Sequence, residues 1–129
     1  MLEKDMQSLF TKWLKENCKR NGAYELKICK KKSMPFSAVQ EHQVNALWKA
    51  KHSCLVHKIS DMSLGAKPMD CFSLSRAKAF VVILFYVPRE PKECFLIDID
   101  DFIKCMETSK RKSLTYEMAD EIAEEIINL

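Results

Sequence analysis

The chain is poor in glycine and lacks the short motifs of several large enzyme classes. Only 2 of its 129 residues are glycine, so it has no glycine-rich loop of the kind that cradles nucleotide phosphates. It also has no Ser-His-Asp arrangement for nucleophilic catalysis, no internal repeat and no low-complexity tract. These absences exclude nucleotide-binding loops and repeat architectures, and they leave any chemistry to individual side chains.

The cysteines include no Cys-x-x-Cys pair. The six residues are Cys18, Cys29, Cys54, Cys71, Cys94 and Cys105. In a chain of this length without a secretory signal, we expect them to be reduced and mostly buried as small apolar side chains. His52, Cys54 and His57 resemble part of a zinc site, but no second close pair of ligands accompanies them. The sequence therefore disfavours both a disulfide framework and structural zinc.

Long hydrophobic runs are absent as well. The apolar run from Ala79 to Val87 covers nine residues, too few to cross a membrane, and no signal peptide precedes the first predicted helix. With 47% apolar and 30% charged residues, the composition is that of an ordinary globular protein. The sequence predicts one domain over residues 1–129, soluble and cytoplasmic, with no membrane partner.

The positive charge is concentrated in the first half of the chain. The net charge is only +3, but residues 1–60 contain 12 lysines and arginines against 5 acids, whereas residues 61–129 contain 9 against 13. Within the basic half, Lys30, Lys31 and Lys32 are consecutive and could contact phosphate groups of a nucleic acid. The alternative is a solvated lysine run that protects a sheet edge.

Hydrophobic periodicity predicts an α/β or α+β domain. Apolar residues from Met6 to Leu14 have helical spacing, and Asn21-Gly22 is a typical helix stop. Strands are expected near residues 24–29, 54–59, 69–74, 79–86 and 94–99, which gives a single mixed sheet of about five strands flanked by helices. The uninterrupted apolar character of Phe80 to Phe85 predicts a central strand that is covered on both faces.

The C-terminal segment has the pattern of one more helix, from Tyr116 to Asn128. Thr115 is a plausible N-cap, and Met118, Ile122 and Ile126 form the apolar face. The opposite face is acidic. It is either solvated or a contact between two copies of the chain.

A candidate site begins in the strand Tyr24–Cys29. Side chains alternate along a strand, so Tyr24, Leu26 and Ile28 face a core while Glu25 and Lys27 lie together on the other face. A carboxylate there can bind a hard divalent cation, and the lysine can orient or deprotonate a water molecule. The alternative is that both residues are simply solvated.

A helix is predicted to follow this strand and the lysine turn. Ser37, with Gln40 three residues later, has the pattern of a capping box at a helix start. Gln43 then lies in a stripe that is otherwise apolar and includes Val39 and Leu47. A glutamine in such a stripe is either a core amide bonded to the backbone or a residue of the site.

This order of residues resembles the PD-(D/E)xK nuclease superfamily. The Glu-x-Lys strand, the basic turn and the helix with His42-Gln43 and Leu47 look most like Holliday-junction-resolvase-like proteins of the RecU type or small phage-encoded relatives. The likeness extends from about Phe10 to Ile99, and its motifs are short. It implies a restriction-endonuclease-like core and a bacterial or phage context.

The resemblance implies roles for specific residues. Glu25 would bind Mg²⁺ or Mn²⁺, Lys27 would serve the attacking water, and Gln43 would support the site. The superfamily usually carries a metal-binding aspartate on a strand before the Glu-x-Lys strand, but here only Asn21-Gly22 separates the first predicted helix from Ala23, so no such strand fits. Asp70, which follows a proline turn, is the proposed replacement in a permuted order, with Asp61 as its competitor.

Two classes of function follow. The first is a magnesium-dependent endonuclease that acts on DNA, with branched, Holliday-junction-like DNA one candidate substrate, and that functions in recombination or repair as a homodimer. In this class Lys30, Lys31, Lys32 and Lys67 contact the nucleic acid, and Glu25, Lys27, Gln43 and Asp70 form the catalytic site. The second is a non-catalytic nucleic-acid-binding or protein-binding module on the same fold.

Overall fold

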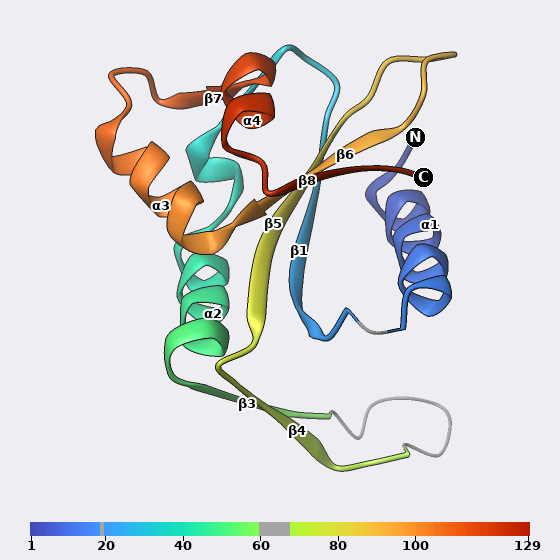
Figure 1. The fold of residues 1–129 in the computed structure, drawn as a ribbon, viewed down its shortest axis with the longest axis vertical. Coiled ribbons are helices and arrows are strands. Elements are labelled where there is room, and N and C mark those ends of the chain that lie inside the picture. The colour runs from blue at the N-terminus through green and yellow to red at the C-terminus, as the bar shows by residue number, and fades with distance from the viewer. Residues whose placement is uncertain (19, 60–67) are drawn as a thin grey trace.

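The computed structural model describes residues 1–18, 20–59 and 68–129. The helices along these residues are α1 (Glu3–Glu16), α2 (Glu41–His52), α3 (Ile99–Thr108) and α4 (Tyr116–Ile122), with a 3-10 turn at Phe36–Ala38. The strands are β1 (Gly22–Cys29), β2 (Ser33–Pro35), β3 (Cys54–Lys58), β4 (Cys71–Ser75), β5 (Lys78–Phe85), β6 (Glu93–Asp98), β7 (Ser113–Thr115) and β8 (Glu125–Asn128). Figure 1 shows their arrangement.

The main sheet contains four strands in the order β1-β5-β6-β8. Strand β1 is parallel to β5, and β6 is antiparallel to both β5 and β8. The predicted mixed sheet flanked by helices is therefore confirmed as the fold class. Two further antiparallel pairs, β2 with β7 and β3 with β4, lie outside the main sheet. The strands expected at 54–59 and 69–74 form the second of these pairs rather than a part of the main sheet.

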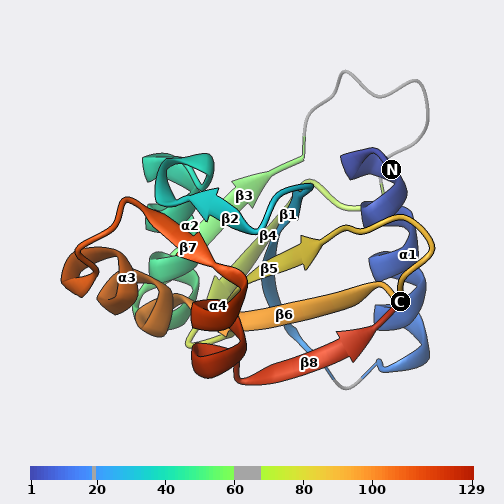
Figure 2. The same ribbon diagram turned by 90° about the horizontal axis from the view of Figure 1, so that it is seen from above.

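Strand β5 lies inside the main sheet, and its side chains are buried on both faces. Val81 and Ile83 pack on the side of α2 and α3, while Val82 and Leu84 pack on the side of α1. Figure 2 shows α1 on one side of the sheet and α2, α3 and α4 on the other. The predicted central, doubly covered strand is confirmed.

The end of α1 and the start of α2 both differ from the prediction. Helix α1 ends at Glu16, where the Asn17 amide donates to the Trp13 carbonyl at 2.8 Å. Gly22 serves the sheet rather than a helix stop, because a Cβ there would lie 2.6 Å from the backbone oxygen of Lys78. Helix α2 starts at Glu41 rather than Ser37, since the 3-10 turn comes first and Gln40 is the N-cap residue.

The predicted C-terminal helix is wrong beyond Ile122. Thr115 does cap α4, because its Oγ1 accepts a hydrogen bond from the Met118 N–H at 3.2 Å. Ala123 then adopts an extended conformation, and β8 pairs with β6. In this strand Ile127 is buried and Ile126 is 44% exposed, which is the alternation of a strand and not the stripe of a helix.

Helix α3 has no counterpart among the predicted elements. Its N-terminus is capped by Asp98, whose carboxylate accepts a hydrogen bond from the Asp100 N–H at 2.9 Å. Phe102 is fully buried and packs edge-on against Phe36, with ring centroids 5.8 Å apart. The helix therefore completes the core on the α2 side of the sheet.

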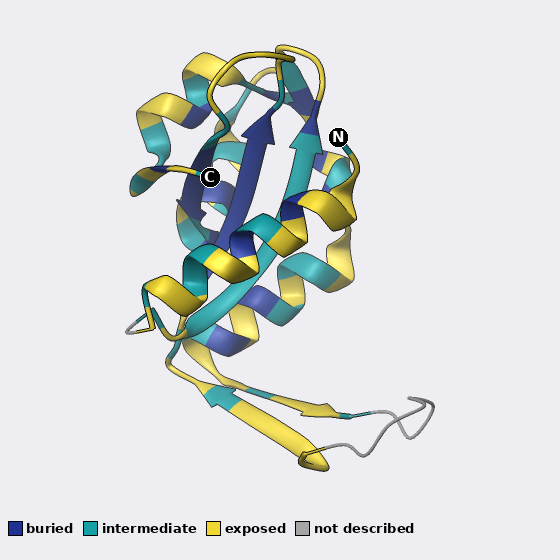
Figure 3. Cartoon of the chain, turned by 90° about the vertical axis from the view of Figure 1, so that its right-hand side faces the viewer, coloured by how far each residue is buried: buried dark blue, intermediate teal, exposed yellow. Residues whose placement is uncertain are grey.

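The β3–β4 hairpin projects from the rest of the molecule, as Figure 3 shows. Leu55 and Leu74 pack against the core at its base, whereas Val56 and Phe72 are 62% and 41% exposed. Both strands of the hairpin carry polar side chains. A strand inside the main sheet is buried on both faces, and these groups would have no contact with water there.

The described residues also bear on two further expectations. None of their helices combines the length and the apolar character needed to span a lipid bilayer. The six cysteines are free, but Cys18, Cys54 and Cys71 are exposed, so the prediction of mostly buried cysteines is wrong. Two of these three lie on the projecting hairpin, which explains their exposure.

Candidate functional site

Strand β1 places Glu25 and Lys27 on one face of the sheet. Tyr24 and Leu26 pack on the α1 side, so Glu25 and Lys27 face the α2 side by the alternation of a strand. Their register partners on β5 are Val81 and Ile83. The pair therefore lies beside fully apolar side chains, yet β1 is the last strand of the sheet, and both side chains keep part of their surface exposed.

The Glu25 carboxylate contacts two nitrogen donors. Lys27 Nζ lies 3.3 Å from Glu25 Oε1, and Gln43 Nε2 donates to the same oxygen at 2.9 Å. Gln43 Oε1 accepts from the Gln40 N–H at 3.0 Å, which fixes the orientation of the amide. The structure thus brings together three of the four expected catalytic residues. We call Glu25, Lys27 and Gln43 the β1 cluster.

The first residues of α2 explain why Gln43 reaches Glu25. Gln43 is the third residue of α2, and its side-chain oxygen satisfies an N–H at the helix start that has no partner within the helix. Because the oxygen is used in this way, the NH₂ group points to β1. The amide is neither a core glutamine bonded only to backbone nor a free surface residue.

The fourth expected residue lies elsewhere. Asp70 directly precedes β4, beside the Lys58–Cys71 pair at the end of the β3–β4 ladder. Its carbonyl accepts a hydrogen bond from the Ile59 N–H at 2.8 Å, and the residue is exposed. It does not belong to the group around Glu25. Its competitor Asp61, and Lys67 of the expected nucleic-acid contacts, fall outside the described residues.

Whether the β1 cluster can bind a divalent cation depends on the ligand atoms that it offers. Within the described ranges, no group of three or more His, Cys, Asp or Glu residues is arranged to hold a metal ion. Mg²⁺ is commonly held by one or two carboxylates together with substrate phosphates and water. The Glu25 carboxylate suits an ion that is bound partly by substrate, and it does not suit one held by protein ligands alone.

Lys30, Lys31 and Lys32 lie in the turn between β1 and β2. All three are exposed. They border a hollow of about 380 Å³ whose other lining residues are Phe85, Tyr86, Val87, Tyr116 and Glu117. The lysine run is therefore not only a solvated edge, because it adjoins an aromatic depression.

A polar network that the sequence did not reveal joins α2 to α3. Lys51 Nζ lies 2.7 Å from Asp98 Oδ1 and 2.6 Å from Asp100 Oδ2, and His52 Nε2 lies 2.8 Å from Asp100. Burial acts to raise the pKa of Asp100, but the hydrogen bonds from Lys51 and His52 outweigh it, so the pKa is lowered. The network holds the end of α2 against the start of α3, which is a structural role.

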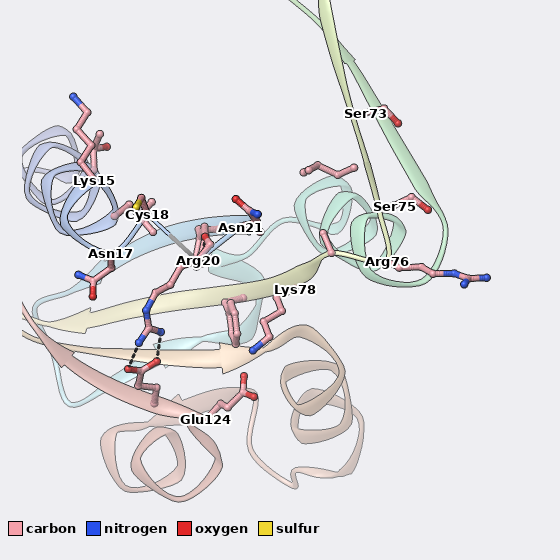
Figure 4. A pocket seen from close by; sticks show the side chains of 18 residues that line it. Lys15, Asn17, Cys18, Arg20, Asn21, Ser73, Ser75, Arg76, Lys78 and Glu124 are labelled. Atoms are coloured by element: carbon pink, nitrogen blue, oxygen red, sulfur yellow. Dashed lines mark hydrogen bonds and ion pairs between the residues drawn. The ribbon is translucent and has the colours of Figure 1, made fainter.

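A larger hollow of about 1280 Å³ lies between the end of α1, the β4–β5 turn and the start of β8. Arg20 Nη2 donates to Glu125 Oε1 at 2.8 Å within it, and Figure 4 marks this ion pair with dashed lines. The Lys15 and Arg76 side chains extend away from the others in that view. Beyond this ion pair, the charged side chains that line the hollow are Lys15, Arg76, Lys78 and Glu124, so the lining as a whole has a net charge of +2.

No family model, no curated protein and no solved structure matches this chain. The resemblance to the PD-(D/E)xK superfamily therefore depends on the residues of the β1 cluster and their order in the sequence. The restriction-endonuclease-like core stays a prediction.

Proposed function

We propose that this protein is a magnesium- or manganese-dependent endonuclease that hydrolyses phosphodiester bonds in DNA, branched DNA included. The observation that carries the proposal is the contact of one carboxylate with a lysine ammonium and a glutamine amide, on the Glu-x-Lys strand of a mixed sheet. An acid that contacts both an amine and an amide provides the groups that the resemblance assigns to such a centre.

Each residue of the β1 cluster has a role in this proposal. Glu25 is the protein ligand of the cation, and the cation supplies charge for the phosphate and a more acidic bound water. Lys27 orients the attacking water from the same face of the strand. Gln43 holds the carboxylate in place, because its amide is itself fixed by the Gln40 N–H.

The ion pair of the β1 cluster is expected to contribute little to the stability of the fold. The side chains of Lys27 and Glu25 are 17% and 26% exposed, so both have lost much of their hydration beside apolar neighbours. Ion pairs of this kind contribute little to stability, because the loss of hydration offsets the attraction between the charges.

A homodimer in the cytoplasm belongs to the same proposal. A four-way junction presents two strands for cleavage, so two copies of the β1 cluster would act on one substrate molecule. The molar mass of the protein alone and with a four-way junction, from light scattering, tests this part separately.

The second candidate function is a nucleic-acid-binding module without catalysis. The observation that favours it is the position of Asp70, next to the β3–β4 pair, whereas Glu25 belongs to the main sheet. Within this function Lys27 neutralises Glu25, and the exposed lysines supply binding without hydrolysis.

The deciding experiment is the Lys27→Ala variant. We expect it to bind a labelled four-way junction as wild type does and to cut it at least about 100-fold more slowly, because the water is no longer oriented. Lys49→Ala, which removes an exposed lysine of α2, is the matched control and should cut normally. Equal cleavage by wild type and Lys27→Ala would refute the role of Lys27. No cleavage of branched, duplex or single-stranded DNA by wild type would refute the nuclease and favour the binding module.

Metal binding has a readout that does not need cleavage. A ligand that binds only the folded state raises the melting temperature, so Mn²⁺ should stabilise the wild-type protein. Glu25→Gln should lose this gain, and Glu41→Gln, at an exposed acid in the first turn of α2, should keep it. A gain that is absent in wild type, or that survives in Glu25→Gln, removes Glu25 as a ligand.

A further inference from the structure

The β2–β7 pair joins two basic segments that are far apart in the sequence. Strand β2 follows Lys30–Lys32, and β7 follows a second triplet, Lys110, Arg111 and Lys112. The Tyr116 N–H donates to the Lys32 carbonyl, and the Phe36 N–H donates to the Lys112 carbonyl, each at 3.0 Å. The two triplets therefore flank one short ribbon, and we call all six residues the basic ribbon.

The basic ribbon is suited to a polyanion. All six side chains are exposed. Their mutual repulsion opposes folding, and an anionic partner relieves it. The second triplet lies in the half of the chain that is acidic overall, and the antiparallel pairing of β7 with β2 places it at the opposite end of the ribbon from Lys30–Lys32.

The hollow beside Lys30–Lys32 adds aromatic surface to this charge. Tyr116 is 39% exposed, and its ring is held edge-on by Phe85 and Phe95 at centroid distances of 5.5 and 5.2 Å. Tyr86 and the exposed Val87 complete the apolar lining. The volume of about 380 Å³ is within the range of small-molecule sites.

The charges around the hollow determine which part of a nucleotide it can take. Glu117 lines it, and the Tyr116 hydroxyl lies 3.4 Å from Glu93 Oε2, so the interior disfavours a phosphate. The lysines at its border favour one. This arrangement suits a base that stacks inside, with its phosphates outside along the basic ribbon.

We propose that the basic ribbon and its aromatic hollow bind single-stranded nucleic acid, with one unpaired base against Tyr116. Aromatic platforms beside cationic grooves are how proteins hold single strands, whereas a paired base in a duplex offers no free face. Cys29, the last residue of β1, lies about 7 Å from Lys27 along the strand, at roughly 3.3 Å per residue, and Lys30 follows it directly. The inference rests on the proposed function for its biological meaning, and it gives the nuclease substrates with unpaired stretches, such as branch points or flaps.

The first test compares rings at position 116 by fluorescence anisotropy. The probes are a labelled thymidine oligonucleotide and a duplex of the same length. Tyr116→Leu should bind the single strand about tenfold more weakly, because stacking of one base is lost, and should bind the duplex as wild type does. Tyr116→Phe should bind both probes normally. Trp48→Leu removes another exposed aromatic, on α2, and is the control for ring loss elsewhere.

The second test compares two triple variants, each of which replaces three positively charged side chains by glutamine. Lys110→Gln/Arg111→Gln/Lys112→Gln should weaken single-strand binding and flatten its salt dependence, by about 0.7 in slope for each phosphate that the protein no longer neutralises. Lys4→Gln/Lys12→Gln/Lys15→Gln removes the same charge from exposed positions of α1, on the other side of the sheet, and should change neither.

The results separate this inference from the proposed function. Tyr116→Leu that still binds single strands normally, or an equal loss of binding in both triple variants, overturns the inference whatever the cleavage data show. Single-strand binding that depends on Tyr116, in a protein that never cuts DNA, supports the inference and refutes the nuclease.

Discussion

Strands β1 and β5 are parallel neighbours in one sheet, yet they carry opposite kinds of side chain at matching positions. On the α2 face, Glu25 lies beside Val81 and Lys27 beside Ile83. Val81 and Ile83 are fully buried, whereas the polar pair keeps part of its surface in water. The difference follows from position, because β5 has a strand on each side and β1 ends the sheet.

This comparison separates what stabilises the fold from what is accessible for chemistry. The β5 side chains contribute through apolar burial on both faces of the sheet. The β1 pair has polar groups next to that core, held by Gln43 and still reachable from solvent. An edge strand can therefore carry a polar pair on a rigid element without the cost of full burial.

The largest expected effect is a difference between the two strands in how much a substitution lowers the free energy of unfolding. Ile83→Ala should lower the free energy of unfolding by about 2–5 kcal/mol, because a fully buried side chain is replaced by a cavity. Lys27→Ala, at its register partner, should cost less, about 1–2 kcal/mol, because Glu25 loses its ion-pair partner but keeps the hydrogen bond from Gln43. Urea denaturation of both variants measures this. Similar losses in the two variants would mean that β1 and β5 do not differ as described.

A second prediction concerns the amide that joins α2 to β1. Gln43→Ala removes the bond to Glu25 and the bond from the Gln40 N–H, and should cost about 1–3 kcal/mol. Gln43→Glu keeps an acceptor for Gln40 but turns a carboxylate toward Glu25. Under the proposed function both variants lose cleavage per folded molecule. Activity that follows only the folded fraction would make Gln43 a structural residue.

A third, smaller effect tests whether the polar network between α2 and α3 behaves like the β1 cluster. Asp100→Asn removes the partner of Lys51 and His52 and should cost less than about 1 kcal/mol at neutral pH, because these groups are partly exposed. The lowered pKa of Asp100 stabilises the fold above the unfolded value near 3.8, and the contribution disappears as pH falls through the folded pKa.

The unfolding curves of wild type and Asp100→Asn should therefore converge on acidification below pH 3.8, while cleavage at neutral pH is unchanged. A difference that grows as the pH falls would contradict this assignment. A loss of cleavage in Asp100→Asn would show that the α2–α3 network takes part in the site.

The smallest expected effect is a difference in reactivity between buried and exposed cysteine thiols, which changes neither stability nor activity. Burial raises the pKa of Cys94, on β6, to about 12, so it should resist alkylation of the native protein near pH 8. Cys54 and Cys71 on the hairpin are exposed and should react. Mass spectrometry after brief labelling distinguishes them. Rapid labelling of Cys94 would show that the sheet opens more readily than its packing indicates.

Local patterns in the sequence predicted much of the fold and part of the candidate site. The alternation from Tyr24 to Ile28 and the apolar run of β5 were confirmed, because each pattern follows from the geometry of a single strand. The C-terminal helix was wrong because Ile122 and Ile126 fit a helical spacing, while pairing with β6 turns residues 125–128 into a strand. Propensity is a weak prior against such pairing.

The sequence by itself determined that Glu25 and Lys27 share one face, since residues two apart in a strand must do so. It did not determine what meets them. Gln43 reaches Glu25 across 18 residues, and the second basic triplet reaches the first only through β2 and β7. The tertiary structure also placed Asp70 next to the β3–β4 pair, whereas Glu25 belongs to the main sheet. Contacts between distant segments depend on how whole elements pack, and local periodicity carries no information about that packing.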